Sequence, residues 1–194
     1  MAAAGRSRVV LNGPAVLRLE GRTCCIRPWR ESDAASLVEH ANNVNVAKSL
    51  RDRFPHPYTR RDANDFLRHA AASFDPSNLA IDVAGAAVGA IGYVPGTDVE
   101  RYSAEIGYWL GEAFWGRGIV TEAVRLMTDH AFGRLDMLRL FALPFADNLA
   151  SVRVLEKAEY VREGLLCASS EKYGVPRDQL LYARVNPGWK PHSA

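Results

Sequence analysis

The chain has 194 residues, of which 48% are hydrophobic and 24% charged, which is typical of a globular domain with a sizeable core. Its formal net charge of +2 and its scattered basic residues give no support to nucleic-acid binding. Since no apolar stretch approaches the ~18 residues of a membrane span, we expect neither a nucleic acid nor a membrane as partner.

Residues 16–187 are predicted to form a single domain, between an N-terminal tail (1–15) and a C-terminal tail (188–194). The first tail is small and basic, with an apolar run too short for a signal peptide. Three cysteines without a C-x-x-C motif suit a reducing cytoplasm. The five histidines show no metal-binding spacing, so no metal is expected.

In the first part of the chain we predict one strand and then two helices, over residues 23–27, 34–41 and 59–73. Both helices begin at side chains that can accept hydrogen bonds from free backbone amides, Ser32-Asp33 and Thr59 to Asp62. Residues 50–58 contain two prolines and are predicted to form a loop.

After a turn at residues 75–78, the apolar period changes from about 3.6 residues to 2. The pattern then predicts three strands, a helix, a strand, a short helix and two strands, over residues 79–83, 88–94, 102–110, from 119 to about 131, 138–143, 151–158, 161–166 and 179–185. The order β-α-α-β-β-β-α-β-α-β-β predicts a mixed sheet flanked by helices, an α/β or α+β domain.

Residues 115–120, Trp-Gly-Arg-Gly-Ile-Val, form a glycine-rich elbow where the long helix begins. The first amides of a helix lack partners within the helix, and the helix dipole adds partial positive charge there. The elbow therefore predicts a site for phosphate or pyrophosphate.

Two common phosphate motifs do not fit this elbow. The spacing from Gly111 to Gly116 matches a nucleoside-triphosphate loop, but Arg117 and Gly118 stand where Lys and Ser or Thr are needed. A dinucleotide fingerprint would require a third glycine at Thr121 and an acidic residue about 20 residues later, where the chain is apolar.

The elbow and the strand before it resemble the acetyl-CoA loop of the GNAT N-acetyltransferase superfamily, Q/R-x-x-G-x-G/A after a strand. The likeness is greatest to the branch of the ribosomal-protein N-terminal acetyltransferases RimJ and RimL. Matching motifs between residues 16 and 185 are Arg27-Pro28 with Asp33, Ala104 to Leu110, Trp115 to Ala123, Asn148-x-x-Ser151, and Arg177-Asp178-x-x-Leu181-Tyr182.

The resemblance implies a mostly antiparallel sheet of six to seven strands with about four helices. Two parallel strands, 104–110 and 138–143, would splay apart to hold acetyl-CoA, with no metal. Elbow amides would bind the pyrophosphate, and the end of the first strand would pair with the pantetheine arm. The implied cofactor residues are Trp109, Leu110, Gly111, Gly116, Arg117, Gly118, Val120, Thr121, Asn148 and Ser151.

Some of these positions have a structural alternative or depart from the family pattern. Asn148 and Ser151 could simply cap a helix. Val120 replaces a small residue, and we expect its side chain to point into the helix–sheet interface. Glu159 replaces a glycine after the short helix, where it would strain a left-handed backbone by ~1 kcal/mol.

Four residues are candidates for the acid–base chemistry. Glu105 is a charge inside an apolar strand, either paired structurally or, as in histone-type GNAT enzymes, a base toward the amine. Glu171 is the rival base, one residue from the corresponding RimL position. By resemblance Ser151 would donate to the departing thiolate, and Tyr182 is either the acid or a core tyrosine.

The resemblance implies a cytoplasmic N-acetyltransferase, a monomer or homodimer, that moves an acetyl group from acetyl-CoA to a primary amine in a ternary complex. The acceptor would be a protein N-terminus, a lysine or a small amine, bound between residues 50–58 and the loop 168–176. Arg51, Asp52 and Arg53 are candidates for contacting it. The alternative is a non-catalytic acyl-CoA-binding sensor or scaffold on the same fold.

Overall fold

The computed structural model describes residues 17–72 and 78–191, and the predicted tail 1–15 and turn residues 75–77 lie outside them. Its strands are β1 Leu19–Glu20, β2 Cys25–Arg27, β3 Asn78–Val83, β4 Ala86–Pro95, β5 Ser103–Leu110, β6 Arg139–Ala142, β7 Val161–Lys172 and β8 Val175–Val185. Its helices are α1 Ala34–Ala41, α2 Val44–Ala47, α3 Arg60–Ala72, α4 Ile119–Arg134 and α5 Leu149–Lys157.

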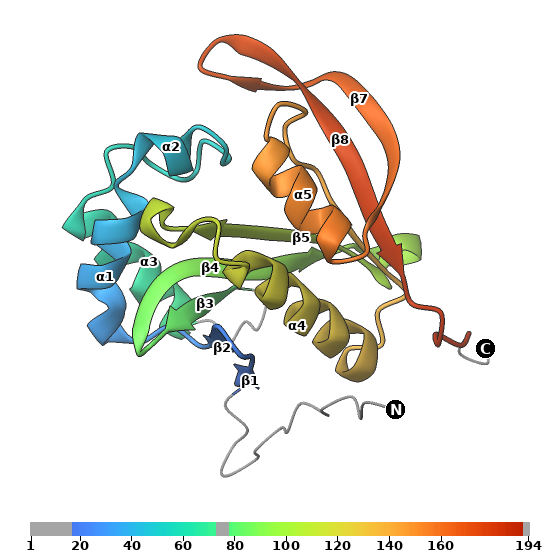
Figure 1. Ribbon diagram of the computed structural model, residues 1–194, viewed down its shortest axis with the longest axis horizontal. Helices are drawn as coiled ribbons and strands as arrows, with labels where there is room; N and C mark the ends of the chain where they lie inside the picture. The colour runs from blue at the N-terminus through green and yellow to red at the C-terminus, as the bar shows by residue number, and fades with distance from the viewer. Residues whose placement is uncertain (1–16, 73–77, 192–194) are drawn as a thin grey trace.

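The strands form one sheet in the order β1-β2-β3-β4-β5-β6-β8-β7 (Figure 1). Within the described residues, neighbouring strands are antiparallel except β5 and β6, which are parallel. The predicted mixed, mostly antiparallel sheet is therefore confirmed. The described part has eight strands and five helices, more than the expected six to seven strands and about four helices. The sequence did not predict the short elements β1 and α2, because they show no clear period.

Helices cover both faces of the sheet, and the alternation along β5 shows which residues face which layer. Ile106 and Leu110 belong to the main core, together with buried residues of α4 such as Met127. Trp109 packs instead against a second cluster formed by α1 and α3, which includes Leu37. Because successive strand residues point to opposite faces, the α4–α5 layer and the α1–α3 layer lie on opposite sides.

The Arg27-Pro28 motif with Asp33 proves to be a buried ion network. Arg27 is 2% exposed, and its guanidinium donates to both Asp33 oxygens at 2.8 Å and to Asp82 at 2.6 Å. We expected Asp33 to cap α1. The helix does begin after it, but the carboxylate makes no cap bond and binds Arg27 and the amide of Arg30 instead. The network ties β2, β3 and the start of α1 together.

The helix starts and ends are otherwise close to expectation. Thr59 and Asp62 form reciprocal hydrogen bonds at the start of α3, as in a capping box. After α5, Glu159 adopts a left-handed φ of 67°, as predicted for this position, and its carboxylate pairs with Arg184 at 2.7 Å.

The segment 168–176 is not the predicted loop, because β7 and β8 continue through it as a hairpin that rises beyond α5 (Figure 1). Tyr173 and Gly174 both have positive φ, 56° and 79°, as a two-residue hairpin turn requires. Register shifts along β7 break the alternation of apolar and polar residues, and this hid the strand in the sequence.

Candidate active site

The candidate site begins where β5 and β6 part. Their parallel register runs from Ser103↔Arg139 to Glu105↔Phe141, while β5 continues to Leu110. The carbonyl of Tyr102 accepts hydrogen bonds from the β6 side. Because backbone groups of alternate residues point to the same neighbour, those of Tyr108 and Leu110 face the space beyond the end of β6. The predicted splayed pair is confirmed.

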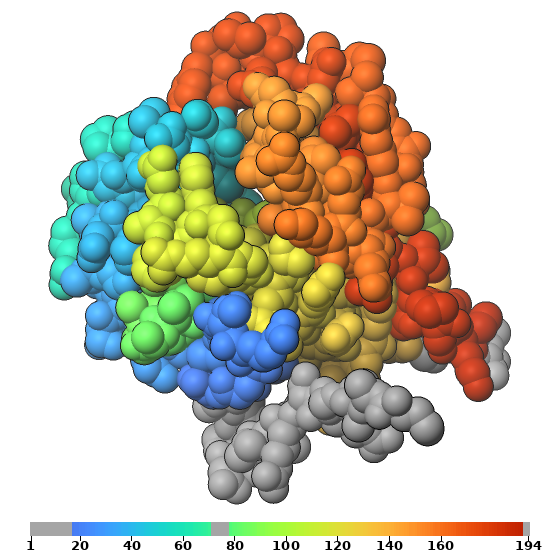
Figure 2. Space-filling view, viewed as in Figure 1, coloured from blue at the N-terminus to red at the C-terminus, as the bar shows by residue number. Residues whose placement is uncertain are grey.

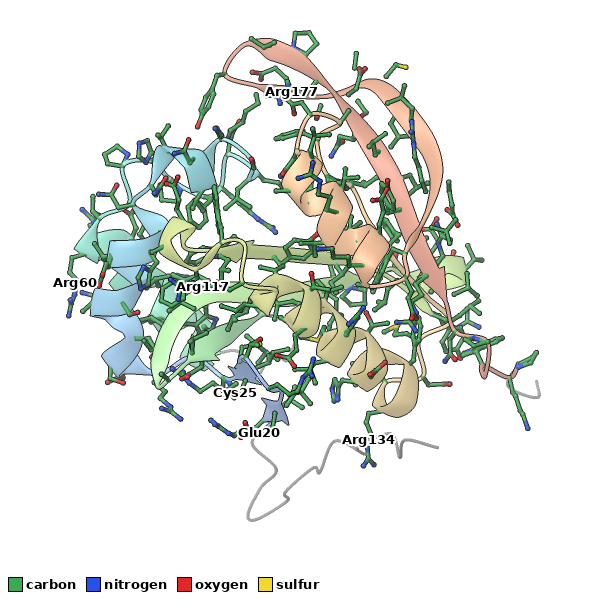
Figure 3. The ribbon with its side chains drawn as sticks, viewed as in Figure 1. Glu20, Cys25, Arg60, Arg117, Arg134 and Arg177 are labelled. Carbon is green, nitrogen blue, oxygen red and sulfur yellow. The ribbon has the colours of Figure 1, made fainter. Side chains whose placement is uncertain are left out.

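The glycine elbow follows directly. Gly116 and Gly118 have φ of 75° and 76°, and a Cβ added at either would meet no atom within 4 Å. Gly118 is the N-cap residue of α4 and Arg117 is exposed beside it (Figure 3). The free amides at the helix start therefore border open space, as a pyrophosphate site needs. The Trp115 indole donates to the Leu110 carbonyl at 2.8 Å and joins the elbow to β5.

Two further α4 residues explain how the elbow is held. Val120 packs against the main core, as we expected of its side chain. Glu122 accepts hydrogen bonds from the amides of Arg22 and Thr23, at 2.8 and 2.7 Å, and so ties the β1–β2 turn to the first turn of α4. Gly21 permits this approach, because a Cβ there would lie 2.8 Å from the Glu122 carboxyl carbon.

Asn148, Ser151 and Tyr108 form a chain of contacts beside the gap. Asn148 is the N-cap of α5, and its side chain accepts from the Ser151 amide at 3.1 Å. The Ser151 hydroxyl lies 2.8 Å from the hydroxyl of half-buried Tyr108 on β5. Burial raises the pKa of Tyr108 far above its ordinary value, so the phenol stays protonated.

Glu105 lies on the other face of β5, with Gly107 and Trp109. Its carboxylate forms an ion pair with Arg51 at 2.5 Å, and 29% of its side chain is exposed. Gly107 is exposed, and a Cβ there would meet nothing within 4 Å. A small open space therefore separates Glu105 from the Trp109 ring.

The remaining two acid–base candidates have structural partners. The phenol of Tyr182 is buried and donates to Glu156 at 3.0 Å, which joins β8 to α5. The exposed Glu171 accepts from the amide of Gly174 and stabilises the hairpin turn. The structure thus places Glu105 and Ser151 on the two faces of β5, while Tyr182 and Glu171 each make a hydrogen bond that links structural elements.

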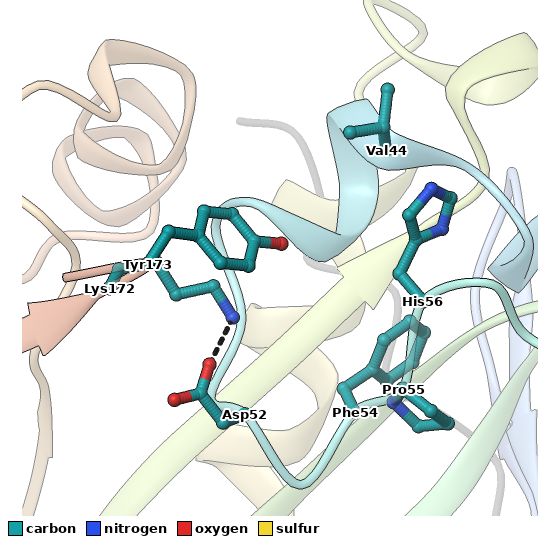
Figure 4. Close-up of a pocket in the computed structure, with 7 residues that line it drawn as sticks. All are labelled: Val44, Asp52, Phe54, Pro55, His56, Lys172 and Tyr173. Carbon is teal, nitrogen blue, oxygen red and sulfur yellow. Dashed lines mark hydrogen bonds and ion pairs between the residues drawn. The ribbon is translucent and has the colours of Figure 1, made fainter.

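A pocket of about 460 Å³ lies between the segment before α3 and the β7–β8 hairpin (Figure 4). Its lining is mixed aromatic, apolar and charged: Val44, Asp52, Phe54, Pro55, His56, Lys172 and Tyr173. Lys172 has a side chain only 3% exposed and pairs with Asp52 at 2.6 Å, so the two walls are joined by an ion pair.

The pocket connects to β5. Phe54 makes an edge contact with the ring of Trp109, with centroids 5.5 Å apart, and Arg51 from the same segment reaches Glu105. On this side of the molecule the surface is hollowed where the cyan α2 segment and the yellow-green elbow face the orange start of α5 (Figure 2). The sequence indicated both walls of the pocket but not the Lys172–Asp52 pair.

The sequence pattern missed two residues at the site, Tyr108 and Gly107. Tyr108 lies 43 residues from Ser151, so no local pattern links them. Gly107 has no positive φ or turn to mark it. Among the described residues, no helix is long and apolar enough to span a membrane, and no cluster of His, Cys, Asp and Glu could hold a metal ion.

This fold matches that of solved acetyltransferase domains, with a TM-score of 0.78 to one from Bacillus anthracis. A family model described as an acetyltransferase (GNAT) domain matches residues 24–161, more than half of the chain. The chain belongs to the GNAT acetyltransferase family.

Individual relatives support the same assignment. The chain is 45% identical over 85 residues to the probable N-acetyltransferase YjcK of Bacillus subtilis, covering 44% of this chain and 47% of that protein. It is 33% identical over 84 residues to the ribosomal-protein-serine acetyltransferase of Escherichia coli, covering 43% and 46%. The matches span about half the length of these curated relatives. The predicted likeness to the ribosomal-protein acetyltransferases is confirmed.

Among solved structures, Mycobacterium smegmatis RimJ in complex with CoA-disulfide matches with a TM-score of 0.73 and 26% identity. The match covers 84% of this chain and 81% of that one.

Proposed function

We propose that the protein transfers an acetyl group from acetyl-CoA to a primary amine, by direct attack while both substrates are bound. The observation that carries the proposal is the gap between β5 and β6, which opens beside a glycine elbow with free helix amides. A pantetheine arm can pair with the free edge of β5 while the pyrophosphate binds the amides of residues 116–121.

The residues present fit such a co-substrate. The elbow glycines leave open space where side chains would stand. The Trp115 indole occupies the Leu110 carbonyl, so the backbone of Tyr108 is the part of this edge proposed to pair with the arm. The solved RimJ relative holds a CoA disulfide, which supports the same ligand class here. When bound, acetyl-CoA supplies the activated acyl group.

The amine is proposed to approach from the Glu105 face of β5. An attacking amine must be neutral, so a carboxylate near it can accept a proton directly or through water. Glu105 is the candidate base because it is partly exposed beside the open space above Gly107. The amine would have to displace Arg51 from one carboxylate oxygen.

The pocket between Phe54 and the β7–β8 hairpin is the proposed acceptor site. Its aromatic and apolar walls with one ion pair fit an acceptor that carries apolar groups next to its amine. A protein N-terminus, a lysine side chain and a small amine all meet this description.

The free thiols Cys24, Cys25 and Cys167 support a reducing compartment such as the cytoplasm.

The test is a screen of the purified chain with acetyl-CoA against N-terminal peptides, lysine peptides and small amines. We expect release of free thiol together with the mass gain of one acetyl group on at least one acceptor. Tight CoA binding without thiol release from any amine would instead favour the sensor or scaffold alternative.

A matched pair of variants tests the cofactor site. Gly118→Ala and Gly85→Ala both place a side chain at a positive φ, 76° and 91°, with nothing near the new Cβ. Both should therefore strain the backbone similarly. Only Gly118→Ala should weaken CoA binding, by about tenfold or more, because only Gly118 lies in the elbow. Equal CoA affinities in the two variants would contradict the site.

A further inference from the structure

We propose that Tyr108 is a positioning residue for acetyl transfer, whose phenol holds the Ser151 hydroxyl so that the serine proton points toward the departing sulfur. The inference rests on the proposed function and deepens it. It assigns a role to a residue of β5 that neither the glycine elbow nor the acid–base candidates include.

The geometry fixes Ser151 from two sides. Its amide donates to Asn148 at 3.1 Å, and its hydroxyl oxygen lies 2.8 Å from the Tyr108 hydroxyl. The carbonyl of Ser151 is a second acceptor for the phenol, but at 3.4 Å. The Ser151 hydroxyl is therefore held by a contact with Tyr108 and does not rotate freely at the surface.

Either hydroxyl of this pair could donate to the other, and in the proposed arrangement the phenol is the donor. Burial keeps Tyr108 protonated, so the phenol always has one proton to place. The hydroxyl of Ser151 at 2.8 Å is a better acceptor than its carbonyl at 3.4 Å, which is near the limit of a hydrogen bond. With the phenol donating to the serine oxygen, the serine proton remains free for another acceptor.

The position of Tyr108 and Ser151 beside the gap indicates which group accepts the serine proton's hydrogen bond. The backbone of Tyr108 faces the gap beyond the end of β6, and its side chain reaches from β5 to the start of α5. The pair therefore lies along one side of the gap. A thioester held by the free edge of β5 would have its sulfur beside these hydroxyls.

The proton and electron balance is simple. The amine nitrogen bonds to the acetyl carbon, the carbon–sulfur bond breaks, and its electron pair stays on sulfur as a thiolate. Ser151 donates a hydrogen bond to this developing charge, as an oxyanion-hole donor does. The nitrogen loses its proton to Glu105 or water, and the thiolate later takes one from water. Tyr108 keeps its proton throughout.

The first experiment compares Tyr108→Phe, Ser151→Ala and the double variant in steady-state kinetics. Loss of a single transition-state donor typically lowers kcat about 10²-fold, so we expect this for Ser151→Ala. Tyr108→Phe should lower kcat about tenfold with little change in the KM for acetyl-CoA. The double variant should be no worse than Ser151→Ala, because Tyr108 acts through the serine.

Tyr160→Phe is the matched control. Tyr160 is a buried tyrosine of the same core, and its hydroxyl lies 2.8 Å from the Thr128 hydroxyl. Tyr160→Phe therefore removes a phenol hydroxyl with one hydroxyl partner, as Tyr108→Phe does, but from a contact that does not include Ser151. It should leave kcat unchanged. A wild-type kcat in Tyr108→Phe, an equal loss in Tyr160→Phe, or additive losses in the double variant would overturn the proposal.

A binding readout decides the question without turnover. The wild-type chain should bind CoA more tightly at pH 9 than desulfo-CoA, because the Ser151 hydroxyl, oriented by Tyr108, favours the thiolate. Tyr108→Phe should reduce this preference several-fold, while Tyr160→Phe keeps it. Equal preference in Tyr108→Phe and the wild type would overturn the inference even if acetyl transfer is observed. If no amine is acetylated, the proposed function fails, and this measurement still tests Tyr108.

Discussion

At the scale of single residues, Glu105 shows how one side chain can satisfy both a structural and a chemical requirement. A carboxylate within an apolar strand needs a partner, and Arg51 provides it at 2.5 Å. The same carboxylate remains 29% exposed on the face where the proposed acceptor pocket meets β5. An ion pair that is partly exposed is weak, so an acceptor amine can compete for it.

Glu105→Gln tests the base directly. Glutamine keeps the size of the side chain but cannot take up a proton, so kcat at neutral pH should fall about 10²-fold. The CoA affinity should not change, because the residue faces away from the α4 layer. Glu163→Gln is the control, since it breaks an Arg–Glu pair of equal length, 2.5 Å, that includes none of the candidate site residues. If Glu105→Gln kept near-normal activity across the pH range, the role of Glu105 would be structural rather than catalytic.

Glu159 is a second residue with a local effect, here on stability. Its φ of 67° is unfavourable for a side chain with a Cβ, while its ion pair with Arg184 is 69% exposed on the glutamate side and adds little. Glu159→Gly should therefore raise the free energy of unfolding by up to about 1 kcal/mol. Urea denaturation would measure it. A loss of stability would mean that the ion pair outweighs the backbone strain.

At the scale of elements, the first turn of α4 depends on a contact between Glu122 and the β1–β2 turn, about 100 residues earlier in the chain. Burial alone would raise the pKa of Glu122, but hydrogen bonds from Thr23 and Arg22 outweigh it and lower the pKa. The carboxylate therefore stabilises the fold above the ordinary glutamate pKa of 4.5. This contribution is lost as pH falls through the lowered value in the folded state.

Glu122→Gln should thus lower stability by about 1 kcal/mol at neutral pH and weaken CoA binding a few-fold, because the elbow loses its anchor. The difference in melting temperature between wild type and variant should shrink as the pH drops below about 4. Glu163→Gln removes another carboxylate whose pKa is lowered, here by Arg139, so it should show the same pH trend in stability without weakening CoA binding. A difference that stays constant down to pH 3 would exclude this role for Glu122.

Sequence periodicity predicted the elements whose residues alternate or repeat cleanly, such as β3, β4, β5 and α4. It also predicted parts of β7 and β8, over residues 161–166 and 179–185, but not their continuation into a hairpin, where bulges disturb the alternation. At the site, the glycine elbow was predictable because its cause is local. The contact between Tyr108 and Ser151 was not, because it depends on how β5 and α5 meet in the folded chain.

At the scale of the whole molecule, the sheet separates two tasks. The gap between β5 and β6 is bordered by the α4–α5 layer and its glycine elbow, while the proposed acceptor pocket contacts β5 from the α1–α3 side. The two proposed substrates would meet across a single strand. Gly107 lies at this meeting point, between Glu105 and Trp109 on the acceptor face.

Gly107→Val separates the two sites. Valine suits a strand, and its Cβ meets no atom within 4 Å, so the fold should tolerate it. Its methyl groups would fill the open space that the amine must enter, so the KM of the acceptor should rise at least about tenfold. CoA affinity should stay within about twofold. Gly164→Val, at an open position of β7, is the matched control and should change neither value. If Gly107→Val weakened CoA binding while leaving the acceptor KM unchanged, the amine would have to approach from the same side of the sheet as the cofactor.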